Sequence, residues 1–277
     1  MRQGDLHIHT SASDGLVAPA VVAARVAAAG LGFFAISDHN STTGLPVARA
    51  ALPPDGPEMI AGVELSAQPG EGEEIHVLGY GVDADCTALR EVCRELITRK
   101  RRQMLDILSR LRAEGIEVDP QALALEDLER YPGRPALAEL LVSDGVVRSA
   151  GEAFGRYLSS GAGTFVPMPA FSPALCIEAV HAAGGLAVLA HPLISTVDRW
   201  VQALTDMGLD GIEAHRPSLG GNEQLYIEKA AEHFGLFLTG GSDWHGRPKD
   251  GPIGSFTVSE DLLAGFFARL RGGKSPG

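Results

Sequence analysis

The chain has 277 residues, of which 45% are hydrophobic and 21% are charged, and its formal net charge is −12 at pH 7. These values are typical of one large globular domain, or of one domain that carries an insertion. A transmembrane helix is excluded because the chain lacks an apolar run of about eighteen residues. The acidic balance argues against a broad basic face and therefore against long nucleic acid as a partner.

The three cysteines, Cys86, Cys93 and Cys176, are an odd number and form no CxxC pair. This usage argues against a disulfide framework and against a thiolate metal site. The polar N-terminal residues are also unlike a secretory signal. We therefore expect a protein of the reducing cytoplasm with no membrane partner.

The first fifteen residues, Met1–Gly15, combine a short strand pattern with His7 and His9. Residues at i and i+2 of a strand point the same way, so both imidazoles can face one point. The turn that follows brings Asp14 back toward them. Neutral imidazole is a ligand for zinc, manganese and iron, and the pair therefore suggests a metal site. A half-buried strand that merely carries two histidines is the alternative.

Strand and helix patterns then alternate along most of the chain. Strands are expected at residues 32–40, 59–67, 74–82, 186–192, 210–218 and 236–246, and helices at 18–29, 44–52, 173–183, 197–207, 223–234 and 260–271. This alternation predicts an α/β fold of parallel βαβ units. From residue 87 the sequence becomes helical and more charged. We expect residues 87–165 to form an inserted helical subdomain covering the site, and residues 1–86 and 166–277 to form the main domain.

Residues that can bind metals recur near the expected carboxyl ends of the strands, the face where α/β barrels gather their active-site groups. They are His7, His9, Asp14, Asp38, His39, Glu64, His76, His191, His215, Asp243 and His245. They are too many for one ion. Two or three zinc, manganese or iron ions that share a carboxylate fit their number, and Glu64 is the natural bridge.

Six motifs, in this order, resemble those of the polymerase and histidinol phosphatase (PHP) family: DLHIHTSASDG, ISDHN, GVELS, IHVLGYG, LAHP and GSDWHG. The resemblance implies a distorted, TIM-like (β/α)7 barrel with a trinuclear metal site. By motif, one metal takes His7, His9, Glu64 and Asp243, a second takes Glu64, His76 and His191, and a third takes Asp14, His39 and His245.

Two further stretches, GRPALAELLVSDG and FGRYLSSGAGTFVP, resemble stand-alone PHP phosphoesterases that act on nucleoside 3′,5′-bisphosphates or on 5′ ends of short RNA. The resemblance implies a metal-dependent phosphoesterase in which a hydroxide bridging two metals attacks phosphorus. Ala136 and His215–Arg216 depart from that subgroup and leave the substrate open. The alternatives are a histidinol-phosphate phosphatase and a non-catalytic metal-binding module.

Candidate substrate contacts are Arg134, Arg148 and Arg216, because the planar guanidinium suits phosphate. For Arg148, a surface salt bridge is an equal alternative. His215 is a candidate general acid for the leaving oxygen, or a substrate contact. Asp38 adjoins His39 and is a candidate for orienting an imidazole.

Overall fold

The computed structural model describes residues 1–70, 73–123, 125, 127 and 131–272. Its strands form one eight-stranded sheet in the order β7-β6-β5-β4-β3-β2-β1-β8. The strands are β1 (Gln3–Ile8), β2 (Phe33–Ile36), β3 (Glu58–Gly70), β4 (Glu73–Tyr80), β5 (Leu186–Leu189), β6 (Gly211–His215), β7 (Phe237–Gly240) and β8 (Val258–Ser259).

The sheet curls until the segment after β7 lies beside β1. The Trp244 amide donates to the His7 carbonyl at 3.2 Å, and the His9 amide donates to the Trp244 carbonyl at 2.8 Å. Ile8 and Trp244 thereby form a parallel bridge between the two ends of the sheet. The result is a nearly closed barrel, which confirms the predicted distorted TIM-like fold.

Strand β4 departs from the predicted parallel arrangement, because it runs antiparallel to both β3 and β5. The physical reason is the short connection between β3 and β4. A parallel pair needs a crossover of about a dozen residues or more, whereas a hairpin closes with very few. His76 therefore lies in the first half of its strand and pairs with Ser66. The reversal places it at the same end of the barrel as the carboxyl ends of the parallel strands.

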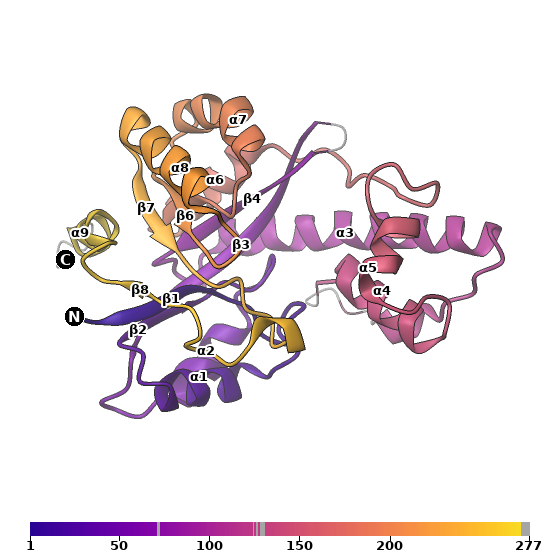
Figure 1. Cartoon of the computed structure of the whole chain (residues 1–277), viewed down its shortest axis with the longest axis horizontal. Coiled ribbons are helices and arrows are strands. Elements are labelled where there is room, and N and C mark those ends of the chain that lie inside the picture. The colour runs from indigo at the N-terminus through magenta and orange to yellow at the C-terminus, as the bar shows by residue number, and fades with distance from the viewer. Residues whose placement is uncertain (71–72, 124, 126, 128–130, 273–277) are drawn as a thin grey trace.

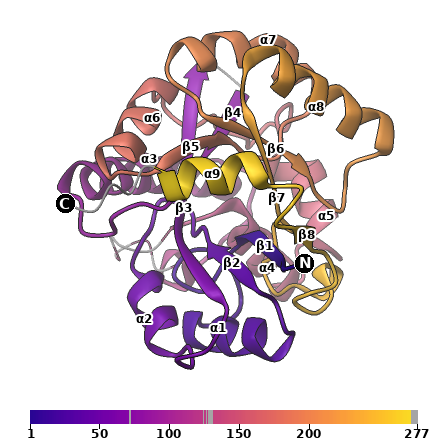
Figure 2. The ribbon, with the colours of Figure 1, turned by 90° about the vertical axis from the view of Figure 1, so that its left-hand side faces the viewer.

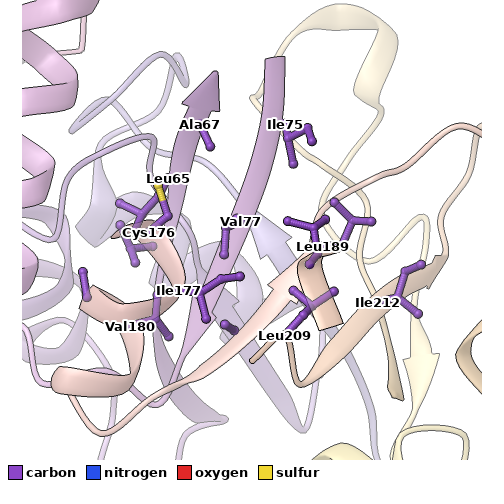
Figure 3. Close-up of a cluster of buried hydrophobic side chains, with 14 of the residues drawn as sticks. Leu65, Ala67, Ile75, Val77, Cys176, Ile177, Val180, Leu189, Leu209 and Ile212 are labelled. Atoms are coloured by element: carbon purple, nitrogen blue, oxygen red, sulfur yellow. The ribbon is translucent and has the colours of Figure 1, made fainter. Parts of the chain in front are cut away.

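Helices cover the outer face of the barrel (Figures 1 and 2). They are α1 (Pro19–Ala28), α2 (Gly44–Ala50), α6 (Pro173–Ala182), α7 (Ile194–Asp206) and α8 (Gly221–Phe234). Figure 3 shows the interface between α6 and the strands, where Cys176 and Ile177 pack against Leu65 and Val77. Both Cys93 and Cys176 are free and buried there, as expected for small apolar side chains.

Helix α9 (Ala264–Gly272) crosses the amino-terminal end of the barrel, as Figure 2 shows. Its Phe266 and Phe267 pack against Phe33 and Tyr80, with ring centroids 5.0 Å apart for Phe33–Phe267 and 5.3 Å apart for Tyr80–Phe266. The Tyr80 hydroxyl donates to the Leu6 carbonyl at 2.9 Å, so its polar atom is satisfied. We call this end of the barrel the apolar end.

A helical region projects from the barrel in Figure 1. It contains most of α3 (Thr87–Ala113), α4 (Arg134–Ser143), α5 (Ala150–Ala153), a 3₁₀ turn (Pro120–Leu123) and a π turn (Phe154–Leu158). A further 3₁₀ turn, Pro248–Asp250, follows β7 in the barrel. No helix in the described part of the chain is long and apolar enough to span a membrane.

Helix α3 belongs to two apolar clusters. Leu89 and Leu96, in its first half, pack into the barrel-side cluster, whereas Ile107 and Leu111 pack with Leu141 of α4. The helix therefore joins the barrel to the helical region without a break. The division into a barrel (residues 1–86 and 166–277) and an insert (residues 87–165) stays a prediction, and we use the word insert for the latter.

Candidate metal centre

Four predicted ligands, from strands β1 and β3 and from the segments that follow β1 and β7, meet at a single point, which we call donor group one. His7 Nε2 lies 3.0 Å from His9 Nε2, 3.4 Å from Glu64 Oε2 and 3.5 Å from Asp243 Oδ1. His9 Nε2 lies 3.2 Å from each of the same two carboxylate oxygens. Strand β1 supplies His7, His9 follows it directly, and β3 supplies the fully buried Glu64.

The second carboxylate oxygen of Glu64 lies in donor group two. Glu64 Oε1 is 2.9 Å from His76 Nδ1 and 2.8 Å from His191 Nε2, and these two nitrogens are 3.2 Å apart. Antiparallel β4 contributes His76, and the turn after β5 contributes His191. Glu64 therefore faces group one with Oε2 and group two with Oε1, which is the geometry of a bridging carboxylate, and its Oε2 also lies 3.0 Å from His39 Nδ1.

Donor group three is more open and contains Asp14, His39 and His245. Asp14 Oδ1 lies 3.3 Å from His245 Nε2 and 3.9 Å from His39 Nε2. His9 Nδ1 also faces this group, 3.9 Å from the same oxygen. All nine predicted ligands are thus brought together at one end of the barrel, which we call the donor end.

The donor end suits cations because several buried polar atoms there lack a well-aligned hydrogen bond and contact only other predicted ligands. Within the described residues, His9 Nδ1 makes no hydrogen bond, Glu64 Oε2 lies 3.0 Å from His39 Nδ1, and Asp14 Oδ1 lies 3.3 Å from His245 Nε2. Such atoms are costly unless a ligand satisfies them. The donor set of imidazole and carboxylate is the one that divalent transition metals prefer. The residues therefore fit divalent metal ions.

The pKa values of Glu64 and His9 also indicate that positive charge is favoured at the donor end. Burial alone raises the pKa of Glu64, but the surrounding imidazoles of His39, His76 and His7 hold it well below its ordinary value. Burial lowers the pKa of His9, yet the neighbouring carboxylates of Asp243 and Glu64, each 3.2 Å from its Nε2, raise it to about 10. In the metal-free protein, protons on imidazoles thus neutralise the carboxylates. Metal ligation requires the same imidazoles to be neutral, so a cation would take the place of these protons.

Backbone strain is concentrated at this end. Among the described non-glycine residues, only Asn40, His191 and Asp243 have positive φ, at 50°, 30° and 55°. Two of them are predicted ligands, and Asn40 follows the ligand His39. Residues in this region of φ/ψ space cost about 1–3 kcal/mol each and cluster at functional sites. The chain also passes very close to β1 at this end of the barrel. A Cβ added to Gly241 would lie only 2.4 Å from the Cβ of His7, so glycine is needed there.

Sequence reasoning missed several residues that hold the ligands in place. Glu213 of β6 lies 3.0 Å from His7 Nδ1 with one oxygen, and its other oxygen accepts from the His191 amide at 2.8 Å. Asp5 accepts from the amides of His7 and Ser242. Asp5 could have been found from the sequence, because it precedes His7 by two residues on one strand and its side chain therefore lies on the same face. Arg247 also contacts Asp14, donating to its carbonyl at 3.0 Å.

Asp38 is buried next to the ligands, and its hydrogen bonds to described residues go to the turn after His9 rather than to an imidazole. Its two oxygens accept from the Thr10 amide, the Thr10 hydroxyl and the Ser13 hydroxyl, each at 2.7 Å. Burial raises its pKa, and these hydrogen bonds oppose the rise. Asp38 therefore fixes the turn between His9 and Asp14, and through it the spacing of groups one and three.

His215 also differs from expectation, because it faces helix α8 rather than the donor groups. Its Nε2 lies 3.8 Å from Glu228 Oε1 of α8, and burial lowers its pKa. A register shift between Glu213 and His215 on β6 explains the change of direction. This position gives no support to His215 as a general acid or a substrate contact, and either role stays a prediction.

The three predicted phosphate contacts have different surroundings. Arg134, the first residue of α4, donates to Glu74 Oε2 and to the Leu158 carbonyl, both at 3.2 Å. Arg148 is exposed, and its backbone amide donates to Glu152, which favours the surface alternative. Neither guanidinium is directed at the donor groups by a contact in the described part of the chain.

Arg216 lies closest to the expected arrangement. It is 9% exposed, and one terminal nitrogen donates to the Pro192 carbonyl at 2.8 Å. The other, Nη1, is buried and has no partner among the described residues. Arg216 lines a cavity of about 520 Å³, whose wall also includes the predicted ligands His191 and Asp243 and the cationic Lys249. The largely buried Arg216 therefore lies in the wall of a cavity that also reaches two predicted metal ligands.

Three curated proteins resemble this chain over most of its length. A 5′-3′ exoribonuclease of Haemophilus influenzae is 33% identical over 87% of this chain and 89% of its own. A phosphoribosyl 1,2-cyclic phosphate 1,2-diphosphodiesterase of Eggerthella lenta is 32% identical, with 88% and 94% covered. A 3′,5′-nucleoside bisphosphate phosphatase of Chromobacterium violaceum is 29% identical, with 89% and 88% covered.

No family model matches the sequence. Among solved structures, one described as a metal-dependent phosphoesterase of Bifidobacterium adolescentis superposes with a TM-score of 0.84 and 28% identity, covering 96% of each chain. The barrel, the convergent donors and these full-length similarities agree with the six motifs. The chain therefore belongs to the PHP family of metal-dependent phosphoesterases, which hydrolyse phosphoric ester bonds.

Proposed function

We propose that the protein hydrolyses a small phosphate ester, with a nucleoside 3′,5′-bisphosphate or the end of a short oligonucleotide as the preferred substrate. The observation that carries the proposal is the meeting of the donor groups through Glu64, with separations of 2.8–3.5 Å in groups one and two. The relatives named for RNA ends and for nucleoside bisphosphates support the substrate class.

Two or three divalent cations, of manganese, zinc or iron, would be held by these groups. Group one offers His7, His9, Glu64 and Asp243; group two offers Glu64, His76 and His191; group three offers Asp14, His39 and His245. Bound there, such ions would polarise phosphoryl oxygens and make water a nucleophile at neutral pH.

The chain's own residues would bind and orient the ester. Arg216 is proposed to bind an anionic group of the substrate in the adjacent cavity through its guanidinium. Arg134 is engaged by Glu74, so its contribution would be positive charge near His76 rather than a bidentate grip. Asp38 is proposed as a positioning residue that holds the turn between His9 and Asp14. The insert is proposed to cover this end of the barrel.

The test is product formation by manganese-loaded protein, read as inorganic phosphate for the small phosphate esters and as released nucleotides for the RNA. Adenosine 3′,5′-bisphosphate, AMP, histidinol phosphate, a short 5′-phosphorylated RNA and phosphoribosyl 1,2-cyclic phosphate are offered in parallel. We expect turnover of the bisphosphate or the RNA, and loss of that turnover when a chelator is added. Turnover of the cyclic phosphate alone would keep the reaction class and change the substrate.

Two outcomes would contradict the proposal. Turnover of histidinol phosphate alone would identify a histidinol-phosphate phosphatase. No turnover of any substrate, with metals bound, would favour the non-catalytic module.

A cytoplasmic location stays a prediction. The structure shows only that no helix among the described residues is long and apolar enough to span a membrane.

A further inference from the structure

We propose that Glu74 couples the insert to the metal centre, so that docking of α3 and α4 on the barrel and cation binding in donor group two stabilise each other. The inference rests on the proposed metal site but not on any particular substrate. It concerns a residue that none of the six motifs singles out as a ligand.

Glu74 is the point where the insert meets a predicted ligand. Its Oε1 lies 3.1 Å from His76 Nε2 and also accepts from the Lys100 ammonium of α3. Its Oε2 accepts from Arg134 Nη2 of α4 at 3.2 Å. The carboxylate is mostly buried, with 16% of the side chain exposed. One carboxylate thus binds a cation from each of two insert helices and an imidazole of the barrel.

The contact with His76 decides which ring nitrogen can bind a metal. His76 presents Nδ1 to Glu64 and His191, and Nε2 to Glu74. When Nε2 carries the proton donated to Glu74, Nδ1 is left as a lone pair facing group two. Partners of this kind orient metal-binding histidines, and their loss typically lowers metal affinity by about 10- to 100-fold.

The insert depends on the same carboxylate. Lys100 is only 3% exposed, and Glu74 is its one ion-pair partner among the described residues. A buried ammonium that loses its partner is strongly destabilising. A second contact lies alongside, because the Tyr131 ring of the insert stacks on the ligand His39 with centroids 4.7 Å apart. The docked insert therefore contacts His39 of group three directly and is linked to His76 of group two through Glu74.

Because the two events share Glu74 and His76, their coupling has to be reciprocal. A cation that fixes the His76 ring also fixes the acceptor of Lys100 and Arg134. A docked insert in turn holds the ring in the metal-binding orientation. We therefore expect the insert to be better protected in the metal-loaded protein than in the metal-free protein.

The test compares Glu74→Gln with Glu73→Gln in the full chain. The amide keeps the shape of Glu74 and removes its charge. Glu73 is the matched control, since it is the neighbouring glutamate of β4 but binds Arg199 and Trp200 of α7 instead of the insert. Two readouts need no substrate: manganese affinity by chelator competition, and the rate of limited proteolysis within the insert, with and without manganese.

For the wild type and Glu73→Gln, manganese should slow cleavage of the insert. For Glu74→Gln, manganese affinity at one site should fall by about 10- to 100-fold, and cleavage should be fast with or without the metal. Wild-type affinity together with wild-type protection in Glu74→Gln would overturn the coupling. A wild-type protein that binds no manganese would instead refute the proposed metal site, so the two failures are distinguishable.

A second variant covers the case in which Glu74→Gln does not fold, as judged by far-ultraviolet circular dichroism. Arg134→Gln removes one of the two insert cations at a side chain that is 26% exposed, and it leaves Lys100 paired with Glu74. In Arg134→Gln, manganese should slow proteolysis of the insert less than it does in the wild type. The loss of protection should be partial, because Lys100 still binds Glu74. Unchanged protection in Arg134→Gln would overturn the coupling in that case.

Discussion

The two ends of the barrel are built from the same strands but are stabilised in different ways. At the apolar end, Phe33, Tyr80 and Phe266 are fully buried, and the polar atom of Tyr80 is hydrogen bonded. At the donor end, His7, His9 and Glu64 are equally buried but titratable. Buried apolar area stabilises the fold whether or not a ligand is present. Buried carboxylates stabilise it only when positive charge accompanies them.

The comparison assigns different roles to the two ends: the apolar end stabilises the fold, and the donor end is expected to bind the metal ions used in hydrolysis. Substitutions at the apolar end should change the free energy of unfolding and leave metal binding by the folded molecules intact. Substitutions at the donor end should abolish metal-dependent turnover and leave the fold intact. Each prediction that follows tests one side of this separation.

The largest effect is expected for His9→Ala, because His9 faces donor groups one and three. Hydrolysis should fall by about 10³-fold, the scale of a lost electrostatic group in an active site, while the circular dichroism spectrum stays that of the wild type. The control is His233→Ala on the exposed face of α8, which should keep full activity. Retained turnover in a metal-analysed His9→Ala protein would contradict the assignment of the donor end.

The counterpart at the apolar end is Phe266→Ala. Phe266 is fully buried and contacts the rings of Tyr80, Phe237 and Phe267. Its truncation should lower the free energy of unfolding by about 3–5 kcal/mol, measured by urea denaturation. Manganese affinity below the transition should not change. An affinity loss as large as that of His9→Ala would show that the two ends are not separable.

Metal removal should destabilise the donor end and make stability depend on pH. A cation at a hundred times its Kd contributes about 2.7 kcal/mol, which chelation would remove. In the chelated protein, Asp243 and Glu64 raise the pKa of His9 from 6.5 to about 10 despite its burial. The stability that protonated His9 contributes is complete below pH 6.5 and is lost as pH rises through about 10.

Urea denaturation of the chelated protein should therefore show stability falling over this pH range. The metal-loaded protein should show a smaller slope, since its ligand imidazoles are already neutral. Equal slopes with and without metal would contradict the view that protons and cations compete for the same donors.

A smaller effect is expected when Arg216→Gln and Arg148→Gln are compared. In Arg216→Gln, transition-state binding should weaken by about 1.5–3 kcal/mol, the range for a hydrogen bond to a charged group. This loss would be measured as a lower kcat/KM. Arg148 is exposed, so its substitution should change stability by no more than about 0.5 kcal/mol and leave kcat/KM unaltered. Equal losses in the two variants would show that the cavity beside Arg216 is not used by the substrate.

Much of the fold and of the ligand set could be predicted because the information is local. His7, His9 and Asp14 lie within one strand and its turn, and the order of the six motifs matches the family. The parallel arrangement expected for residues 74–82 was wrong, although the six residues between the expected strands 59–67 and 74–82 are too few for a crossover helix.

Other features depend on closure of the barrel or on irregularities within strands. The contact between His7 and Glu213 joins residues far apart in sequence that meet only when β1 and β6 share one barrel. The register shift on β6 turns His215 toward α8, and no pattern in the sequence predicts this shift. Glu74 resembles an ordinary charged residue of a strand end until α3 and α4 bring Lys100 and Arg134 to it.

Metal stoichiometry tests the central claim about the donor end most directly. Protein loaded with manganese and then desalted would be analysed by mass spectrometry, beside Asp243→Ala and the His233→Ala control. Two to three ions per chain in the wild type and the control, with fewer in Asp243→Ala, is the predicted result. A wild-type chain that is folded but retains no divalent ion would contradict the claim that these nine side chains form a metal centre.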